Sequence, residues 1–152
     1  MPPQNPGRFS RYGSAIAEHL RRDNFKLLAV DFNPEEVRNW QAQGYDAVYG
    51  DACDHEFISF LPLKSVKWVV SAIPQHDFGL THEDPRFILI DGLKREKYTG
   101  KIAVSTQRSH DIKALKNKGA DLVFLPFHDA ADRAVERMRE ALSENQPHVI
   151  PL

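Results

Sequence analysis

The chain has one cysteine, no long apolar run and almost no net charge. A single cysteine among 152 residues excludes an intrachain disulfide and any site with several cysteine ligands, and it is typical of a reducing compartment. No apolar stretch approaches the roughly 20 residues that span a bilayer, and residues 1–7 lack the features of a signal peptide. A net charge of −1 gives no electrostatic reason to expect nucleic acid or an anionic membrane. We therefore expect a cytoplasmic protein with no nucleic-acid partner and no direct membrane insertion.

The chain also lacks recognisable catalytic and metal-binding motifs. There is no G-x-S-x-G turn, and the carboxylates next to Cys53 should raise the pKa of its thiol, which argues against a nucleophile. His76 and His82 share a polar loop, but their spacing is not that of metal ligands. We therefore predict neither a catalytic nor a metal site.

What the sequence does contain is a regular alternation of helix and strand signals. Asn33-Pro34-Glu35-Glu36 is a strong helix start, with an N-cap, a proline at the first helical position and acids in the first turn. Gly44 and Gly119 are suited to helix C-termini. Helices are predicted at residues 13–22, 34–43, 54–60, 86–97, 109–118 and 129–142, and strands at 25–30, 46–49, 67–73, 101–106 and 121–125.

This order predicts an α/β fold of the Rossmann-like, doubly wound type with a mostly parallel sheet. The length fits one domain. We expect an irregular segment at residues 1–10, a Rossmann-like domain of the kind that binds nucleotides at 11–142, and a C-terminal tail at 143–152. The final helix carries a wide apolar stripe, for which core burial is the usual explanation and dimer contact the alternative.

Three consecutive predicted strands end in residues that fit a ligand site. Asp31 follows a short apolar strand, where a carboxylate can accept hydrogen bonds from a ribose, and we expect it at an exposed strand tip. Asp51 follows the next strand, and its alternative role is a helix N-cap. Ser71, Ala72 and Ile73 end the strand after that, near the point where ligands bind in such sheets. Each residue taken alone also fits an ordinary turn or strand end.

The glycine turn expected before Asp31 is largely missing. Gly13 lies eighteen residues before Asp31, close to the spacing of about 20 that such folds show. If Gly13 is the third glycine of a G-x-G-x-x-G turn, the first two positions hold Arg8 and Ser10. The start of the helix could still offer backbone N–H groups to an anion, or Gly13 could simply lie in an ordinary helix start.

With these residues in view, the chain resembles the Trk-type nucleotide-binding (TrkA-N) domain, also called the RCK domain (regulator of potassium conductance), particularly the versions attached to Kef-like potassium/proton antiporters. The resemblance covers about residues 11–142. It rests on Arg11-Tyr-Gly-Ser-Ala-Ile-Ala-Glu18, Ala29-Val-Asp-Phe-Asn-Pro-Glu35, Val48-Tyr-Gly-Asp-Ala52, Trp68-Val-Val-Ser-Ala-Ile-Pro74 and Gly119-Ala-Asp-Leu-Val-Phe-Leu-Pro-Phe-His-Asp-Ala-Ala-Asp132.

The resemblance implies a non-catalytic regulatory domain that binds NAD(H), or else AMP, ADP or ATP, and controls a potassium or cation/proton transport system. It implies a homodimer held at the inner face of the membrane through a transporter subunit or domain. Asp31 would hold the ribose and Asp51 the adenine. The implied cofactor-binding residues are Ser10, Arg11, Tyr12, Gly13, Asp31, Phe32, Asp51, Ala52, Ser71, Ala72 and Ile73.

The sequence departs from the family at the first, central strand, where it has Pro2-Pro-Gln-Asn-Pro6. Loss of this strand should expose the edges of the two strands beside it. Three explanations stay open: an N-terminally truncated form, a gap filled by another segment or subunit, or a degenerate domain that keeps only its assembly role. A degenerate dimerisation module without nucleotide binding is therefore one alternative function. A small NAD-dependent oxidoreductase is another, although no Tyr-x-x-x-Lys pair is present.

Overall fold

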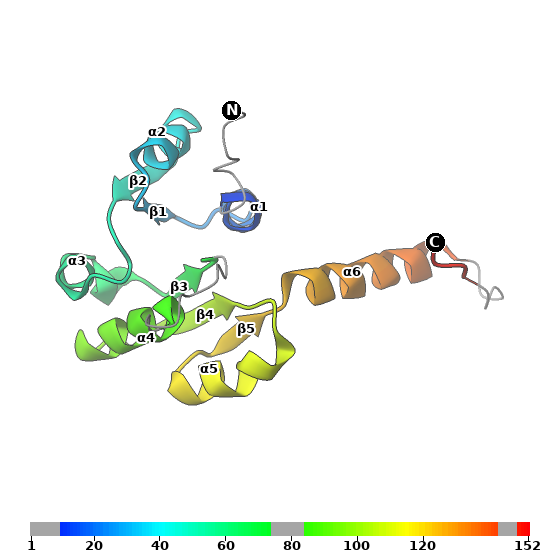
Figure 1. Cartoon of the computed structure of the whole chain (residues 1–152). Helices are drawn as coiled ribbons and strands as arrows, with labels where there is room; N and C mark the ends of the chain where they lie inside the picture. Colours follow the sequence, from blue (N-terminus) through cyan, green and yellow to red (C-terminus); the bar gives the residue numbers. More distant parts are fainter. Residues whose placement is uncertain (1–9, 74–83, 143–148) are drawn as a thin grey trace, which may run out of the picture.

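The computed structural model describes residues 10–73, 84–142 and 149–152. Helices and strands alternate along the chain as the sequence predicts (Figure 1). The elements are α1 (Ser10–Arg22), β1 (Leu28–Asp31), α2 (Pro34–Ala42), β2 (Asp46–Tyr49), α3 (His55–Ser59), the 3-10 turn η2 (Leu63–Ser65), β3 (Trp68–Ser71), α4 (Pro85–Arg95), β4 (Lys101–Ser105), the 3-10 turn η3 (Ser109–Asp111), α5 (Ile112–Lys118), β5 (Leu122–Phe124) and α6 (Pro126–Ala141).

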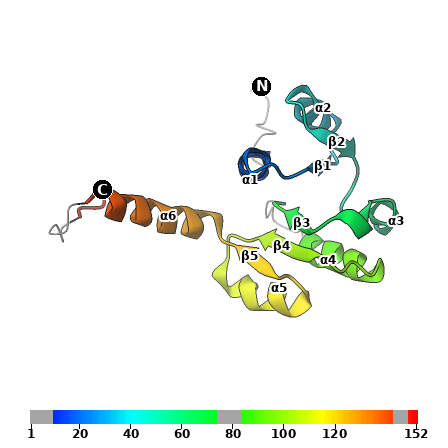
Figure 2. The same ribbon diagram turned by 180° about the vertical axis from the view of Figure 1, so that it is seen from behind.

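The described strands form two separate parallel sheets. One has the order β1-β2 and the other β3-β4-β5, and every strand pair is parallel. Figures 1 and 2 show the two sheets apart from each other from both sides. The prediction of a mostly parallel α/β fold is confirmed, and so is the prediction that two strand edges are open. Within the described residues, the predicted edges are those of β1 and β3 that pair with no strand; β2 and β5 form the other borders of the two sheets.

The larger sheet holds the main core. α4 and α5 pack on one of its faces, with α3 beside α4, because their apolar positions all point to that face. Ile90, Leu93, Val104 and Leu115 are fully buried there. Burying a side chain of this size stabilises the fold by about 1.5–3 kcal/mol, so this half carries most of the hydrophobic stabilisation.

The smaller sheet is covered by α2 and has a thinner core. Val37 of α2 and Ala47 of β2 are its buried apolar residues. The Trp40 and Tyr45 rings meet edge to face at 5.0 Å, and the Arg21 guanidinium of α1 lies 4.5 Å from the Tyr45 ring centroid. Arg21 thereby ties α1 to the α2–β2 turn.

Several element boundaries differ from the prediction. Ser10 is the first residue of α1 rather than the last of an irregular segment. β3 ends at Ser71, two residues before the predicted end at 73. α6 begins at Pro126, three residues before the predicted start at 129, because proline is favoured in the first turn of a helix.

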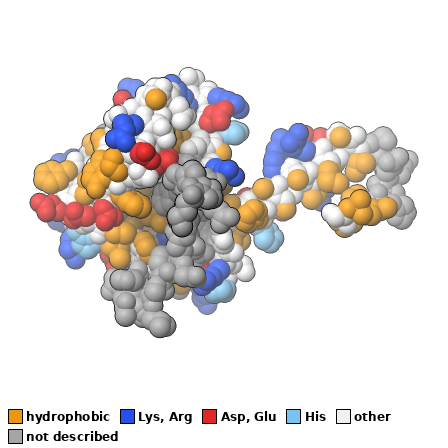
Figure 3. All heavy atoms as spheres, turned by 45° about the horizontal axis from the view of Figure 1, so that its top comes forward, with side chains coloured by type: hydrophobic (Ala, Val, Ile, Leu, Met, Phe, Trp, Pro, Cys, Tyr) orange, Lys and Arg blue, Asp and Glu red, His pale blue; other side chains and the backbone are white. Residues whose placement is uncertain are grey.

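α6 projects away from both sheets (Figures 1 and 2). None of its residues is buried, and Phe127, Val135 and Met138 are exposed. Hydrophobic side chains are visible along this projecting arm in Figure 3. The expectation that core burial explains its apolar stripe is therefore wrong for this chain. Among all the described helices, none is both long and apolar enough to cross a bilayer.

Gly119 ends α5 with a φ of +139°, a conformation that side chains rarely adopt. An added Cβ would also lie 2.7 Å from Lys94 Cε and 3.2 Å from Ile90 Cγ2. We expect Gly119→Ala to lower the free energy of unfolding by about 1–3 kcal/mol, measured by urea denaturation.

The matched control is Gly13→Ala. An added Cβ there would meet Ala72 Cβ at 3.5 Å, an ordinary contact, and φ is not strained. Because alanine is the better helix former, this change should leave the free energy of unfolding within about 1 kcal/mol of the parent. Equal effects of the two substitutions would contradict this account of Gly119.

Candidate functional site

Asp31 is the last residue of β1 and is only 7% exposed. Its Oδ1 accepts a hydrogen bond from Asn33 N at 2.9 Å, and its backbone oxygen accepts one from Gly50 N at 3.0 Å. The predicted position at the end of the strand is confirmed, but the expectation of an exposed tip is wrong. The carboxylate folds over the turn that follows β1, where the backbone N–H of Asn33 holds it in place.

Asp51 lies just beyond β2 and is exposed. Its Oδ1 accepts from Cys53 N at 2.8 Å. The N-cap of α3 is Asp54, whose Oδ1 accepts from Glu56 N at 3.0 Å. The N-cap interpretation of Asp51 is therefore wrong. Because Gly50 donates to the Asp31 backbone oxygen, the structure brings Asp31 and Asp51 to the same sheet edge.

Ser71 is the last residue of β3 and is 5% exposed. Its hydroxyl is buried and has no hydrogen-bond partner among the described residues. An unsatisfied buried hydroxyl costs about 1–3 kcal/mol, and such a group at the carboxyl end of β3 is well placed to contact a ligand. Ala72 and Ile73 follow it and are half-buried.

The other predicted site residues lie around α1 and the strand ends. A Cβ on Gly13 would lie 3.5 Å from Ala72 Cβ, so α1 passes close to the end of β3. Ser10 is the first residue of α1. Arg11 and Phe32 are exposed, while Tyr12 and Ala52 are half-buried. Asp31 ends one strand of the smaller sheet, Asp51 follows the other, and Ser71 ends a strand of the larger sheet. The predicted site is therefore divided between the two sheets.

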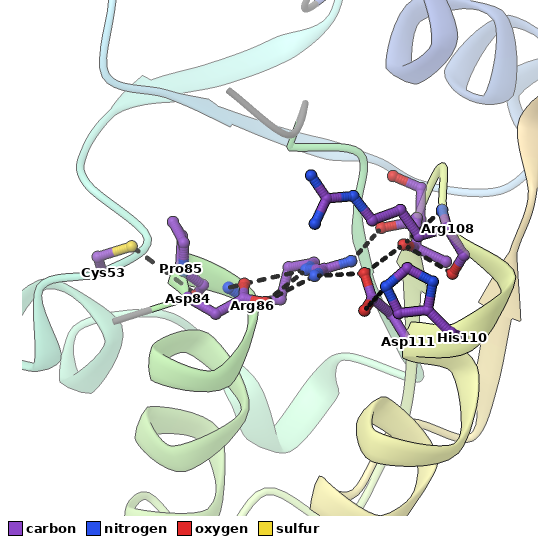
Figure 4. Close-up of polar contacts among 9 residues, drawn as sticks. Cys53, Asp84, Pro85, Arg86, Arg108, His110 and Asp111 are labelled. Carbon is purple, nitrogen blue, oxygen red and sulfur yellow. Dashed lines mark hydrogen bonds and ion pairs between the residues drawn. The ribbon is translucent and has the colours of Figure 1, made fainter. Parts of the chain in front are cut away.

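A buried arginine joins three elements at the carboxyl end of β4 (Figure 4). Arg86, in the first turn of α4, is 3% exposed. Its Nη2 lies 2.6 Å from Asp84 Oδ2 and 3.3 Å from Asp111 Oδ2, and Nη1 donates to Ser105 O at 3.5 Å. The guanidinium thus links the N-terminus of α4, the end of β4 and the start of α5.

The charges explain why this cluster holds together. A cation in the first turn of a helix opposes the helix dipole, and burial acts to lower the pKa of the guanidinium. The hydrogen bonds and charges of Asp84 and Asp111 outweigh both effects, so the Arg86 pKa is raised overall. Sequence reasoning missed this cluster. The available signal was an arginine immediately after the Asp84-Pro85 helix start.

Arg108 and His110 lie beside the cluster (Figure 4). His110 Nε2 is 3.5 Å from Asp111 Oδ1. Arg108 is exposed, and its guanidinium points away from Asp111. The turn before α5 therefore presents an accessible cation at the carboxyl end of the larger sheet.

Cys53 follows Asp51 in the chain and contacts the start of α4, and the pKa of its thiol is raised. Burial is the larger cause, and the charges of Asp51 and Asp84 add to it. The predicted direction is confirmed. The thiol Sγ lies 3.9 Å from Pro85 O, so it contacts the start of α4 in its protonated, weakly nucleophilic form. His76 and His82 lie outside the described residues, and no group of three metal-ligating side chains occurs in the described part.

A pocket of about 310 Å³ lies away from these residues. It is lined by Ser59, Glu96 and the turn from Leu61 to Ser65. These residues precede β3 and β4, so the pocket lies at the amino ends of the strands. Because ligands in open α/β sheets bind outside the carboxyl ends, we base the candidate site on the strand ends instead.

The TrkA-N domain family matches residues 8–126. The chain belongs to the TrkA-N family. Two curated relatives from Bacillus subtilis (strain 168) support this membership. The Ktr system potassium uptake protein C is 26% identical over 123 residues, covering 81% of this chain and 52% of that protein. The Ktr system potassium uptake protein A is 27% identical over 142 residues, covering 93% and 60%. The chain thus spans only about half to three-fifths of the length of these relatives.

Solved structures show the same fold. The NAD(P)-binding domain of an exopolyphosphatase-related protein from Archaeoglobus fulgidus superposes with a TM-score of 0.68 at 23% identity, covering 86% of this chain and 92% of that chain. The TrkA-N domain of the inner membrane protein ybaL from Escherichia coli gives 0.66 at 18% identity, covering 86% and 91%. The GsuK channel bound to NAD gives 0.59 at 16% identity, covering 73% and 19%.

The buried arginine gives a test of how this TrkA-N domain is stabilised. Arg86→Met should lower the free energy of unfolding by about 3 kcal/mol, because it leaves Asp84 and Asp111 close together without their shared cation. Arg108→Met is the matched control. It removes the same group from an exposed position nearby and should change stability by no more than about 0.5 kcal/mol. Urea denaturation measures both, and equal losses would show that the cluster is not the cause.

Proposed function

We propose that this TrkA-N domain is a regulatory, non-catalytic module that binds an adenine nucleotide, with NAD(H) as the first candidate. AMP, ADP and ATP are the alternatives. The observation that carries the proposal is Asp31, a carboxylate oriented at the carboxyl end of a parallel strand. A carboxylate at this position of a dinucleotide-binding fold accepts hydrogen bonds from ribose hydroxyls.

The surroundings of Asp31 support this role. Among the described residues, Asn33 N is the one donor to the Asp31 carboxylate, and it contacts only Oδ1. Oδ2 is therefore available to a ribose hydroxyl. Asp51 is exposed beyond the neighbouring strand and could accept from the adenine amino group. At the end of β3, in the other sheet, the buried Ser71 hydroxyl has no partner among the described residues.

The phosphates need positive partners, because Arg8 and Ser10 replace two glycines of the usual turn. The first turn of α1 could donate backbone N–H groups to an anion. Arg108 adds an exposed guanidinium at the end of β4, suited to a diphosphate. Two solved relatives are described as the GsuK channel bound to NAD and GsuK bound to ADP.

The curated relatives, which are potassium uptake proteins, support a role in the control of a transport system. We propose that the domain acts at the inner face of the membrane through a membrane cation transporter subunit or domain. The Kef-like antiporters of the sequence resemblance are one such partner. Ligand binding would change how the two sheets are held relative to each other and pass that change to the transporter.

The proposed site predicts the effect of one substitution. NAD at 100 times its dissociation constant should stabilise the parent by about 2.7 kcal/mol, a shift of several degrees in melting temperature. Asp31→Asn should abolish that shift, because an amide is a weaker acceptor and also carries donors. The parent should also prefer NAD to NADP, whose extra phosphate would meet the like charge of Asp31.

Asp46→Asn is the control for this experiment, since Asp46 is exposed at the opposite end of β2. It should keep the full NAD shift. NADH, AMP and ATP are tested in parallel. If none of the four nucleotides shifts the melting temperature of the folded parent, the nucleotide proposal fails, and the degenerate dimerisation module becomes the better account. Turnover of a nicotinamide cofactor would instead favour the oxidoreductase.

We also propose that α6 mediates homodimer formation. Its apolar stripe contacts none of the described helices or strands closely enough to bury a residue. The exposed side chains Trp68, Val70 and Leu122 lie on β3 and β5 of the larger sheet. The α6 arm of a second copy would cover exposed apolar surface of this kind. Each Å² of apolar surface buried would stabilise the dimer by about 25 cal/mol, and the two copies would exchange their α6 helices.

Met138→Arg should therefore convert the dimer to a monomer, because a charge in the apolar stripe would be buried without a partner. Glu136→Arg is the matched control: it introduces the same side chain on the opposite, polar face of α6, where Glu136 pairs with Arg133 at 3.0 Å. Sedimentation velocity at fixed concentration measures both. A parent that is monomeric, or a control that dissociates equally, contradicts the α6 interface.

A further inference from the structure

We infer that the amino edge of the larger sheet docks on a lipid surface with anionic headgroups. The inference concerns where the domain is held, and it does not depend on nucleotide binding. It starts from the topology of the larger sheet. β3, β4 and β5 are parallel, so all three begin at the same edge. α4 and α5 return the chain to that edge, so both helices also end there.

Basic side chains gather at this amino edge. They come from η2, from the last turns of α4 and α5 and from the starts of β3 and β4. The same element ends carry three acids, Asp91, Glu96 and Asp121, against eight cations. The net charge of the whole chain, −1, therefore conceals a strongly basic surface. We call these cations the basic edge: Lys64, Lys67, Lys94, Arg95, Lys97, Lys101, Lys116 and Lys118.

Internal contacts account for three members of the basic edge. Lys94 Nζ donates to the Lys118 backbone oxygen, which joins the ends of α4 and α5. Lys118 Nζ lies 3.1 Å from Asp91 Oδ2, and Lys101 Nζ lies 3.7 Å from Asp121 Oδ1. Because cations are also favoured at helix C-termini, these side chains have an ordinary structural role.

The other five cations have no acidic partner. Lys64, Lys67, Arg95, Lys97 and Lys116 are exposed and form no ion pair within the described part of the chain. Lys64, Lys67 and Lys97 lie outside the last turn of any α-helix, so the helix dipole does not explain them. Like charges on one surface repel each other, and an external anionic surface would relieve that repulsion.

An exposed aromatic side chain lies beside the basic edge. Phe60 is 79% exposed. Its chain neighbours Ser59 and Leu61 line the same pocket as Lys64 and Glu96, so the ring is at the rim of this surface. An aromatic ring next to lysines suits the membrane interface, because the ring enters the headgroup layer while the ammonium groups meet the phosphates.

The kinds of side chain favour a lipid surface over an acidic protein. Four of the five unpaired cations are lysines, which are depleted at protein–protein interfaces, whereas arginine is enriched there. A lysine ammonium is a point charge on a flexible stem and suits a diffuse field, while arginine suits planar partners. Docking by this edge would also leave Ser71 and Arg108, at the carboxyl ends of β3 and β4, facing away from the lipid.

The test measures binding of the full chain to large vesicles by sedimentation. Mixed phosphatidylcholine–phosphatidylglycerol vesicles should bind the chain at low salt, and pure phosphatidylcholine vesicles should not. Each basic residue near an anionic surface raises partitioning about fivefold, so the pair Lys64→Gln and Lys67→Gln should lower the partition coefficient about 25-fold. Phe60→Ser should lower it at least about threefold, because the apolar ring no longer enters the interface. Raising the salt should release the bound chain.

The pair Arg38→Gln and Arg137→Gln is the matched control. Both arginines are exposed, one on α2 of the smaller sheet and one on the projecting α6 (Figure 1). This pair removes the same charge away from the basic edge and should keep the partition coefficient within about twofold of the parent, because salt screens distant charges. The melting temperature of each variant, measured without lipid, shows that lost binding is not lost folding.

Poly-glutamate, tested in parallel, represents an acidic protein partner. The inference is overturned if anionic vesicles do not bind the parent, if neutral vesicles bind it equally, or if the control pair loses as much binding as the lysine pair. Binding to poly-glutamate without binding to vesicles also overturns it and indicates an acidic protein instead. Failure here leaves the melting-temperature test of nucleotide binding unaffected.

Discussion

The pairing of parallel strands is the constraint on which the rest of this structure depends. Each strand of a parallel sheet needs a neighbour on both edges and a cover on both faces, or it must lie at the border of the sheet. Here β1 and β3 each have one open edge, and the described strands divide into two sheets. The exposure of Leu28 and Trp68, the thin cover of α1 and the division of the candidate site all follow from that single break.

Local signals in the sequence were enough to predict most of the elements. Asn33 caps α2 through Glu35 N at 3.0 Å, as its position before Pro34 indicated. Gly44 and Gly119 have positive φ just beyond the ends of α2 and α5. These features depend on neighbouring residues, so the sequence contains the information directly. The open edges were also predictable, because the prolines near the N-terminus exclude a central strand there.

Features that depend on distant residues were not predictable in this way. The Arg86 cluster joins residues 84, 86 and 111, and no local pattern shows that these three meet. The apolar periodicity of α6 indicates an amphipathic helix but not what covers it. The burial of Asp31 has a similar cause, because its exposure depends on how the following turn folds over the carboxylate. The roles of the site residues remain predictions, since they depend on a ligand.

The division into two unequal halves also bears on regulation. The larger sheet has a fully buried core at Ile90, Leu93 and Leu115 and the buried Arg86 link, whereas the smaller sheet relies on Val37, Ala47 and aromatic contacts. Asp31 belongs to the weaker half and Ser71 to the stronger. A nucleotide that contacts both would stabilise the arrangement in which the halves are closest, since a ligand shifts an equilibrium by its difference in affinity between the states.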